Sequence, residues 1–373
     1  MEMEAVERLL EWATAEGVIL DGIKPQHLPG RGIGIVATRR LRADERILTV
    51  PTTLLRSLET TPLHIFAALT NASVHAILAA SMCLETSAEF DIWCAVLPSR
   101  EEFAANLPIC WPPSLQALLP SAAQAILAQQ RAKSDRDWSA VSAAFPDIER
   151  DDFLYAWNIV NSRTFYHTTP ETKGLPRDDH MVLQPVADLF NHGADGCLVS
   201  FDDEEYVFTT SQEHEAGDEL FIRYGAHSND FLLVEYGFAL AANQWDEARL
   251  DEYVCPLLSE SQKQALEDRD YWGKYTLDAE SVCYRTMTAL RLLCLDRKRW
   301  LAVLAGTRDE DLDKDVVDAK LLDVLNNFEA NIARHIAMVD AATDGTQDMR
   351  DILRARWVQM KDMVVTAASS LHV

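Results

Sequence analysis

The sequence predicts an α+β protein in which a β-rich domain is split by a helical insertion and followed by an all-helical C-terminal domain. Three observations predict this class. Short runs rich in β-branched residues, typical of strands, occur near residues 33–50 and again within residues 181–223. A long stretch rich in Ala and Leu lies between them. A helical pattern returns beyond Trp245 and continues toward the C-terminus.

The first predicted elements are one helix and two strands. Apolar residues recur at helical spacing within residues 2–15, and Gly17 ends the pattern. Residues 33–36 and 47–50 are short and rich in β-branched residues, so each predicts a strand. The acidic pair at residues 44–45 predicts the turn between them, because Asp tolerates turn conformations.

The middle of the chain predicts helices, and the following region predicts strands again. Helical patterns cover residues 63–83 and 115–133, and prolines divide the stretch into pieces. The next strands are expected at residues 181–183, 198–201, 206–208 and 219–223. Near the C-terminus one apolar stripe predicts a helix with a single buried face, formed by Leu321, Leu325, Phe328, Ile332 and Ile336.

These patterns predict four parts. Residues 1–55 would hold an N-terminal helix and the first β piece, and residues 56–157 the helical insertion. Residues 158–243 would hold the second β piece with the active site, and residues 244–373 a helical substrate-binding domain. No internal repeat of fixed period and no low-complexity tract is present.

Composition and charge exclude several classes of protein. The 373 residues are 48% hydrophobic and 25% charged, as in globular proteins, and no run of about 18 apolar residues predicts a membrane span. The net charge of −25 argues against nucleic-acid binding and favours basic partners, although it could equally serve solubility. The acidic start lacks the pattern of a signal or transit peptide, so we expect a cytoplasmic or nuclear protein, and a monomer.

The seven cysteines predict neither a disulfide framework nor a metal site. Their number is odd, none forms a C-x-x-C pair, and no zinc-ligand spacing occurs. The sequence also lacks a nucleophile elbow and a phosphate-binding P-loop. We therefore expect no metal, and the chemistry must come from other residues.

Two motifs in series carry the most information about function. Residues 183–192 read LQPVADLFNH, and they are followed by RYGAHSN at residues 223–229 and EYGF at residues 235–238. An Asn-His pair or a Tyr-Gly pair alone is common, but the two at this separation are specific. With GRGIG at residues 30–34 and NSRTFY at residues 161–166, the chain resembles SET-domain protein methyltransferases, in particular the Rubisco large-subunit methyltransferase-like branch.

The resemblance implies a cofactor, S-adenosyl-L-methionine, and the residues that bind it. It places Arg31, Gly32 and Ile33 in the first cofactor loop, where glycines let the backbone approach a ligand. It assigns the cofactor's carboxylate end to Arg163, its amino-acid end to Asn191, and its adenine to the backbone of His192 and the ring of Phe238.

It also implies the residues that meet the acceptor. Tyr224 is the expected catalytic residue, with its hydroxyl directed at the methyl sulfonium and the target nitrogen, and it also contacts the cofactor. The expected substrate-binding residues are Tyr236, which would shape the lysine channel, together with Arg163, Phe165 and Asp188.

Alternative structural roles stay open for most of these residues. The glycine-rich segment could be a plain turn, Arg163 could pair with an acid, and Asp188 could cap a turn. His192 as a metal ligand lacks a second ligand at metal spacing, so a structural histidine is the better alternative. Tyr236 and the other aromatic residues could simply fill a core.

The expected activity is transfer of a methyl group to a lysine of a non-histone protein, since the cysteine-rich zinc clusters of many histone-directed enzymes are missing. A basic ribosomal or translation-associated substrate would suit the acidic charge. One alternative is histidine methylation, although Phe165 and Ala187 at the expected acceptor pocket suit a lysine better. The other is a scaffold without activity, but such a chain would be expected to lose Tyr224 or Asn191.

Overall fold

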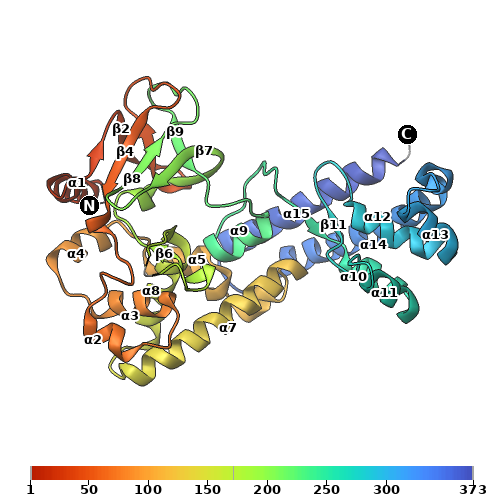
Figure 1. The fold of residues 1–373 in the computed structure, drawn as a ribbon, viewed down its shortest axis with the longest axis horizontal. Helices are drawn as coiled ribbons and strands as arrows, with labels where there is room; N and C mark the ends of the chain where they lie inside the picture. Colours follow the sequence, from red (N-terminus) through yellow and green to blue (C-terminus); the bar gives the residue numbers. More distant parts are fainter. Residues whose placement is uncertain (1, 171, 372–373) are drawn as a thin grey trace. The chain divides into compact units, whose positions relative to one another are not determined.

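The computed structural model describes residues 2–170 and 172–371. These residues form two compact units (Figure 1). Unit 1 contains the chain up to Phe103 together with Gln129–Ala226, and unit 2 contains Ala104–Ala128 and the chain from His227 onward. Each unit draws on two separate stretches of sequence. The predicted division into four consecutive parts therefore differs from this division into two units, each of which is discontinuous in sequence. The four parts stay a prediction.

The sheet of unit 1 has seven strands in the order β1-β4-β8-β7-β9-β3-β2. Their bounds are Ile19–Leu20 (β1), Ile23–Leu28 (β2), Gly32–Ala37 (β3), Arg46–Pro51 (β4), Asn191–Phe201 (β7), Glu205–Thr209 (β8) and Glu219–Ile222 (β9). A second, two-stranded sheet pairs Phe165–Tyr166 (β5) with Met181–Val182 (β6). The sequence predicted β3, β4, β6, β8 and β9 to within two residues, and it predicted the last four residues of β7.

The one parallel pair of the seven-stranded sheet joins β7 to β9. Asn191 and His192 pair with Phe221 and Ile222, and the register then shifts, so that Cys197 faces Ile222 as well. A Cβ at Gly196 would lie 2.6–2.7 Å from the backbone of Ile222 and Arg223. Because backbone cannot move aside as a side chain can, only glycine allows the two chain segments to pass this closely.

Helices form the rest of unit 1 (Figure 1). Their bounds are Glu2–Ala15 (α1), Leu63–Ala68 (α2), Val74–Leu84 (α3), Ala88–Cys94 (α4), Arg100–Asn106 (α5), Ser121–Ala144 (α7) and Arg150–Arg163 (α8), and the unit boundaries fall within α5 and α7. The helical pattern predicted over residues 63–83 corresponds to two helices, α2 and α3, and not to one continuous helix. Ser73 begins the second one, because its hydroxyl accepts a hydrogen bond from Ala76 N at 3.1 Å.

Unit 2 is helical, as predicted. Its helices are Pro113–Gln116 (α6), Asn229–Tyr236 (α9), Asp251–Val254 (α10), Glu260–Glu267 (α11), Tyr284–Cys294 (α12), Arg297–Leu304 (α13), Lys314–Ala341 (α14) and Gln347–Ser370 (α15). It also contains one short pair of strands, Ala248–Arg249 (β10) and Thr276–Leu277 (β11). Next to these strands, the backbone N–H of Leu250 donates a hydrogen bond to Tyr275 O at 2.8 Å.

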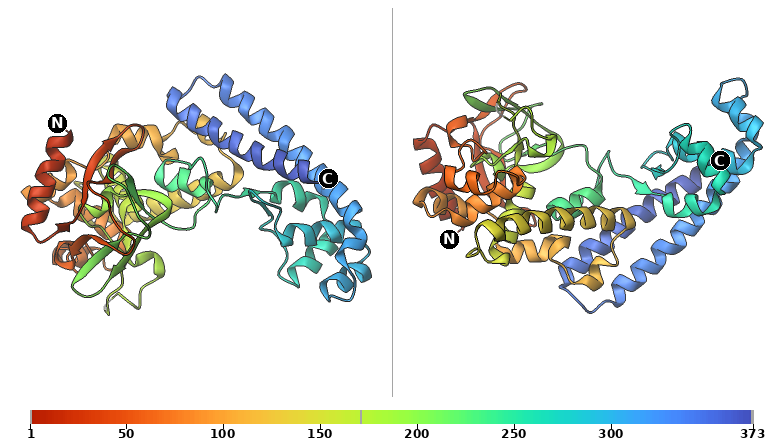
Figure 2. Two further views of the ribbon diagram at one scale, coloured as in Figure 1. Left: turned by 90° about the horizontal axis from the view of Figure 1, so that it is seen from above. Right: turned by 60° about the horizontal axis from the view of Figure 1, so that its bottom comes forward.

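The longest helices of unit 2, α14 and α15, lie side by side in Figures 1 and 2. Four of the five residues of the predicted stripe on α14 are buried in the core of the unit, and Ile336 packs against that core from a half-buried position. Trp357 of α15 belongs to the same core, and its indole Nε1 donates to Leu118 O at 2.9 Å. This packing fixes α15 against the stretch before α7, which lies more than 200 residues earlier in the chain.

Candidate active site

The glycine-rich loop before β3 contains two residues in the left-handed region. Gly30 has φ +74° and Gly32 has φ +66°, and a Cβ at either would meet nothing within 4 Å. The loop is closed by a bond from Arg31 N to Leu28 O at 3.0 Å. The glycines are therefore required by the backbone conformation, and open space remains beside them.

Gly34, two residues further along, is required by crowding. A Cβ there would lie 2.8 Å from Asn191 Nδ2, 2.9 Å from Glu219 Oε1 and 2.6 Å from a methyl carbon of Leu28. Its φ is not in the left-handed region. The close approach that a glycine permits at this position is thus to the side chain of Asn191, one of the predicted cofactor-binding residues.

Glu219 is a central residue that the sequence did not reveal. Its carboxylate accepts a hydrogen bond from Asn191 Nδ2 at 2.8 Å and forms an ion pair with Arg31. It is the first residue of β9, and its side chain is mostly buried. The available signal was an acidic residue opening the strand that leads to Tyr224. Arg31 and Asn191 thus share Glu219 as a partner, which connects two of the predicted cofactor-binding side chains.

A strained turn precedes the Asn-His motif. Val186 is fully buried and has φ 70° and ψ −48°, and Ala187 N donates to Pro185 O at 2.8 Å, which defines a γ-turn. Such a conformation costs about 1–3 kcal/mol for a residue other than glycine and occurs mostly at functional sites. The turn leads into the short 3₁₀ helix Ala187–Leu189, which carries Asp188.

The carboxylate of Asp188 is buried beside a guanidinium. Trp93 Nε1 donates to its Oδ2 at 3.1 Å, while Arg163 Nη1 donates to its backbone oxygen at 2.6 Å and lies 3.8 Å from Oδ2. Oδ1 has no hydrogen-bond partner among the described residues. Burial raises the pKa of Asp188 to about 6, and the charge of Arg163 and the bond from Trp93 oppose the increase.

Two of the open alternatives can be compared with this arrangement. Asp188 lies inside the 3₁₀ helix, whose N-cap is Val186, so it does not cap that helix. Arg163, at the end of α8, pairs with an acid, which is the structural role considered for it. Contact of Arg163 with a cofactor carboxylate, and of Asp188 with a substrate, stay predictions.

Tyr224 joins the two sequence motifs. Its hydroxyl donates to Phe190 O at 2.7 Å, its backbone N–H donates to His192 Nδ1 at 3.1 Å, and its ring lies 5.1 Å from the ring of His192. Burial raises the pKa of the Tyr224 phenol to about 12, while the charge of Arg163 opposes the increase and that of Asp188 adds to it. The phenol is therefore protonated at neutral pH.

Phe165 lies within an aromatic cluster of unit 1. Its ring makes edge contacts with the rings of Phe208 and Tyr206, at 6.0 and 6.5 Å between centroids. Phe208 in turn stacks on Phe190, the residue whose carbonyl oxygen accepts the bond from Tyr224. Core filling, the alternative considered for the aromatic residues, thus describes part of the role of Phe165. Its contact with a substrate stays a prediction.

Tyr236 and Phe238 belong to unit 2. Tyr236 ends α9, and Gly237 follows with φ 82°, the left-handed conformation that commonly ends a helix. The rings of Tyr236 and Phe238 lie 6.2 Å apart, and Tyr236 also contacts the rings of His227 and Phe231. His227 precedes α9 and Phe231 lies in its first turn, so these four rings form an aromatic group along the length of α9.

Within the described residues, no group of three or more His, Cys, Asp or Glu side chains could hold a metal ion. None of the seven cysteines, which all lie within the described residues, forms a disulfide. No described helix is long and apolar enough to cross a membrane.

Comparisons with known proteins identify the fold and the family. The SET domain family model matches residues 32–225, more than half of the chain, and the model of the ribosomal lysine N-methyltransferase 2 C-terminal domain matches residues 246–369. The crystal structure of the SET domain of LSMT bound to methyl-lysine and AdoHcy aligns with a TM-score of 0.67 and 17% identity, covering 99% of this chain and 91% of that one. This likeness shows a shared fold.

Two curated relatives show how far the similarity extends. Ribosomal lysine N-methyltransferase 2 of Saccharomyces cerevisiae is 26% identical over 296 residues, which cover 66% of this chain but only 60% of that protein. SET domain-containing protein 4 of Homo sapiens is 24% identical over 403 residues, covering 98% of this chain and 90% of that protein. With a matched model over more than half of its length, and Asn191, His192 and Tyr224 assembled within that match, the chain belongs to the SET-domain family.

Proposed function

We propose that this chain is a protein-lysine N-methyltransferase that uses S-adenosyl-L-methionine. One observation carries the proposal: within a SET domain, Tyr224 contacts Phe190 through its hydroxyl and His192 through its backbone and ring. The first β piece contributes Arg31 and Gly34 to the same neighbourhood through Glu219. Residues from three distant stretches of sequence therefore meet where a donor and an acceptor could be aligned.

The residues in this neighbourhood suit the cofactor. Its amino-acid end carries an ammonium and a carboxylate. The chain offers the carboxylate of Glu219, and the guanidinium of Arg31 and the amide of Asn191 both contact that carboxylate. Open space lies beside Gly30 and Gly32. When bound, the cofactor supplies an electrophilic methyl group on a sulfonium. Arg31, Gly32, Ile33, Arg163, Asn191, His192 and Phe238 are the residues proposed to hold it.

The acceptor must be an uncharged amine. Free lysine has a pKa of about 10.4, so deprotonating it at pH 7 costs about 4–5 kcal/mol. A channel lined by aromatic rings lowers that cost, because it removes water from the ammonium. Tyr236 and Phe165 are the proposed lining. Tyr224 cannot act as a general base at neutral pH, because its phenol stays protonated. Its role is to align the amine at about 3–3.5 Å from the methyl carbon.

The proposed substrate is a basic ribosomal or translation-associated protein. The match of residues 246–369 to the C-terminal domain of a ribosomal lysine methyltransferase supports this class, and so does the net charge of −25. Such a substrate would be met in the cytoplasm or the nucleus, where we propose that the protein acts as a monomer.

The proposal is tested by incubating the purified chain with tritiated S-adenosylmethionine and purified ribosomal proteins, followed by mass spectrometry of the labelled bands. The expected result is label on one lysine, strongly reduced with Tyr224→Phe and retained with Tyr284→Phe, a half-exposed tyrosine of unit 2. Label on a histidine would favour the alternative acceptor. Absence of both labelling and cofactor binding by calorimetry would favour a scaffold without activity.

A further inference from the structure

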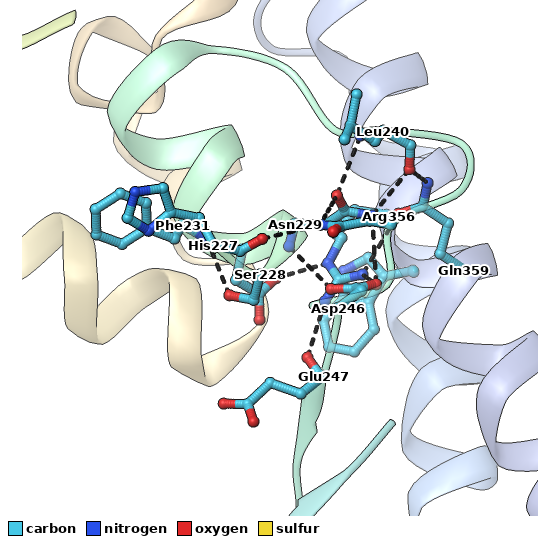
Figure 3. A network of polar contacts seen from close by, with 12 residues as sticks. His227, Ser228, Asn229, Phe231, Leu240, Asp246, Glu247, Arg356 and Gln359 are labelled. Carbon is cyan, nitrogen blue, oxygen red and sulfur yellow. Dashed lines mark hydrogen bonds and ion pairs between the residues drawn. The ribbon is translucent and has the colours of Figure 1, made fainter. Parts of the chain in front are cut away.

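A buried group of charged and amide side chains surrounds Arg356 in unit 2 (Figure 3). Arg356 is fully buried, as is Asp230, and Asp246 is nearly so. The Nε of Arg356 donates to Asp230 Oδ1 at 2.7 Å, and the Nη1 of Arg356 donates to Asp246 Oδ2 at 2.6 Å. Its Nη2 reaches Glu247 O at 3.3 Å. One guanidinium on α15 thus binds the start of α9 and the chain that follows it.

Amide side chains make a second connection beside the first. Asn229 accepts a hydrogen bond from Leu240 N at 3.1 Å and donates to Leu240 O at 2.9 Å, so one side chain satisfies both backbone groups of that residue. Gln359, one turn after Arg356 on α15, also donates to Leu240 O at 2.9 Å. Asp246 accepts from Asn229 N at 2.9 Å. The segment 229–246 is therefore bonded to itself and to α15.

Tyr236 and Phe238 lie between the bonded points of this segment. Asn229 and Asp230 fix the start of α9, and Leu240 fixes the chain just after Phe238. Between these points Gly237 packs tightly against Asn106, because a Cβ at Gly237 would lie 2.9 Å from Asn106 Cβ and about 3.1 Å from the Asn106 backbone. The backbone that carries the two aromatic rings can shift only if these contacts break.

Stability alone does not account for such a group. Two carboxylates share one guanidinium, and Asp230 Oδ2 has no hydrogen-bond partner among the described residues. Removing three charges from water costs more than their attraction returns in many proteins, and apolar replacements are often more stable. The surrounding core of unit 2 is apolar and could have supplied such residues. Directional hydrogen bonds and ion pairs define one geometry for the segment, whereas apolar contacts do not.

We infer that Arg356 is a positioning residue for the acceptor site: through Asp230, Asp246 and the amides of Asn229 and Gln359 it fixes the segment that carries Tyr236 and Phe238, and so sets acceptor affinity and the number of methyl groups transferred. The inference rests on the proposed function, in which Tyr236 lines the lysine channel. It makes α15, more than 100 residues later in the chain, a determinant of specificity.

The test compares Arg356→Met and Gln359→Leu with Arg354→Met. Arg354 is the matched control, because it lies on the same helix but forms only an exposed ion pair with Asp340. Gln359→Leu removes a bond to Leu240 without leaving a buried charge unpaired, so it remains informative if Arg356→Met does not fold. The measurements are KM and kcat for the protein substrate, the ratio of mono-, di- and trimethylated product, the cofactor Kd, and amide hydrogen exchange over residues 229–246.

We expect both test variants to raise KM for the protein substrate by about ten-fold, below the roughly 100-fold loss that a 1 Å misplacement can cause, and to alter the product ratio. The cofactor Kd of both test variants, and all values for Arg354→Met, should match the wild type. The KM of Arg356→Lys should lie between that of Arg356→Met and that of the wild type. Exchange over residues 229–246 should accelerate in both test variants.

Two results would overturn the inference: wild-type kinetics and product ratio in folded Gln359→Leu and Arg356→Met, or unchanged exchange over residues 229–246. If the wild-type chain transfers no methyl group, the proposed function fails. In that case the exchange measurement still decides whether Arg356 fixes the segment.

Discussion

The phenol of Tyr224 is hydrogen-bonded to a part of the chain more than 30 residues earlier in sequence. It donates to Phe190 O, and burial keeps its pKa near 12. A neutral phenol can offer an oriented dipole but cannot remove a proton at pH 7. Its effect on the reaction should therefore come from alignment and electrostatics. That effect should not depend on pH between 6 and 9, since the pKa of the phenol lies well above that range.

Tyr224→Phe tests that role. The ring contact with His192 and the backbone bond are retained, and only the hydroxyl is lost. We expect cofactor binding near the wild-type level and a fall in turnover of about 100-fold, the order found when one preorganised polar group is removed. Calorimetry and single-turnover kinetics check both values. Turnover equal to wild type would show that the hydroxyl has no part in the reaction.

Asp188 should make stability depend on pH in a defined window. Its pKa is raised from 3.8 to about 6 by burial, so the folded state prefers the protonated form. The stabilisation is complete below pH 4 and is lost as the pH rises through 6. At about 1.4 kcal/mol per unit, ionisation of Asp188 above pH 6 costs about 3 kcal/mol.

Asp188→Asn cannot ionise, so it should be more stable than the wild type by up to about 3 kcal/mol at pH 8, with the difference vanishing toward pH 4. Urea unfolding of both proteins across pH 4–8 measures the difference directly. A constant difference, or one that shrinks as the pH rises, would mean that burial does not raise the pKa of Asp188.

At the scale of elements, strand β3 passes so close to Asn191 and Glu219 that Gly34 has no room for a side chain. Gly34→Ala should displace both side chains, cost about 1–3 kcal/mol in stability through overpacking, and weaken cofactor binding by at least about ten-fold. Gly306→Ala is the control, because φ +67° strains alanine while nothing lies near its Cβ, and Gly306 belongs to unit 2 and not to the cofactor loop. Calorimetry should show that this control loses stability but keeps cofactor affinity.

Several elements could be predicted from local sequence, and those that could not have identifiable reasons. Strand β2 was missed because Pro25 argues against a strand, yet β2 is an edge strand, where the missing N–H of proline does no harm. Residues 191–197 of β7 were missed because Gly193 and Gly196 weaken strand propensity. Those glycines serve close packing against β9, a contact that only the folded chain defines.

At the scale of the whole molecule, the net charge of −25 should affect the encounter with a basic substrate. Salt shortens the range of that attraction, from about 10 Å at 0.1 M to about 3 Å at 1 M. We expect kcat/KM for a basic protein substrate to fall steeply with salt, and kcat/KM for a short neutral acceptor peptide to change little. Equal salt dependence for both substrates would indicate that the acidic charge serves solubility alone.

The sequence by itself determined the fold class, the family and the two motifs that meet at Tyr224. These depend on short patterns and on residue chemistry, which are read locally. Only the tertiary structure decided that Glu219 joins Arg31 to Asn191, that Asp188 is buried beside Arg163, and that Arg356 holds the segment around Tyr236. Each of these contacts joins residues 25 or more positions apart. The partners and the pKa values of these residues depend on burial and on distances in space. Burial and such distances exist only in the folded chain.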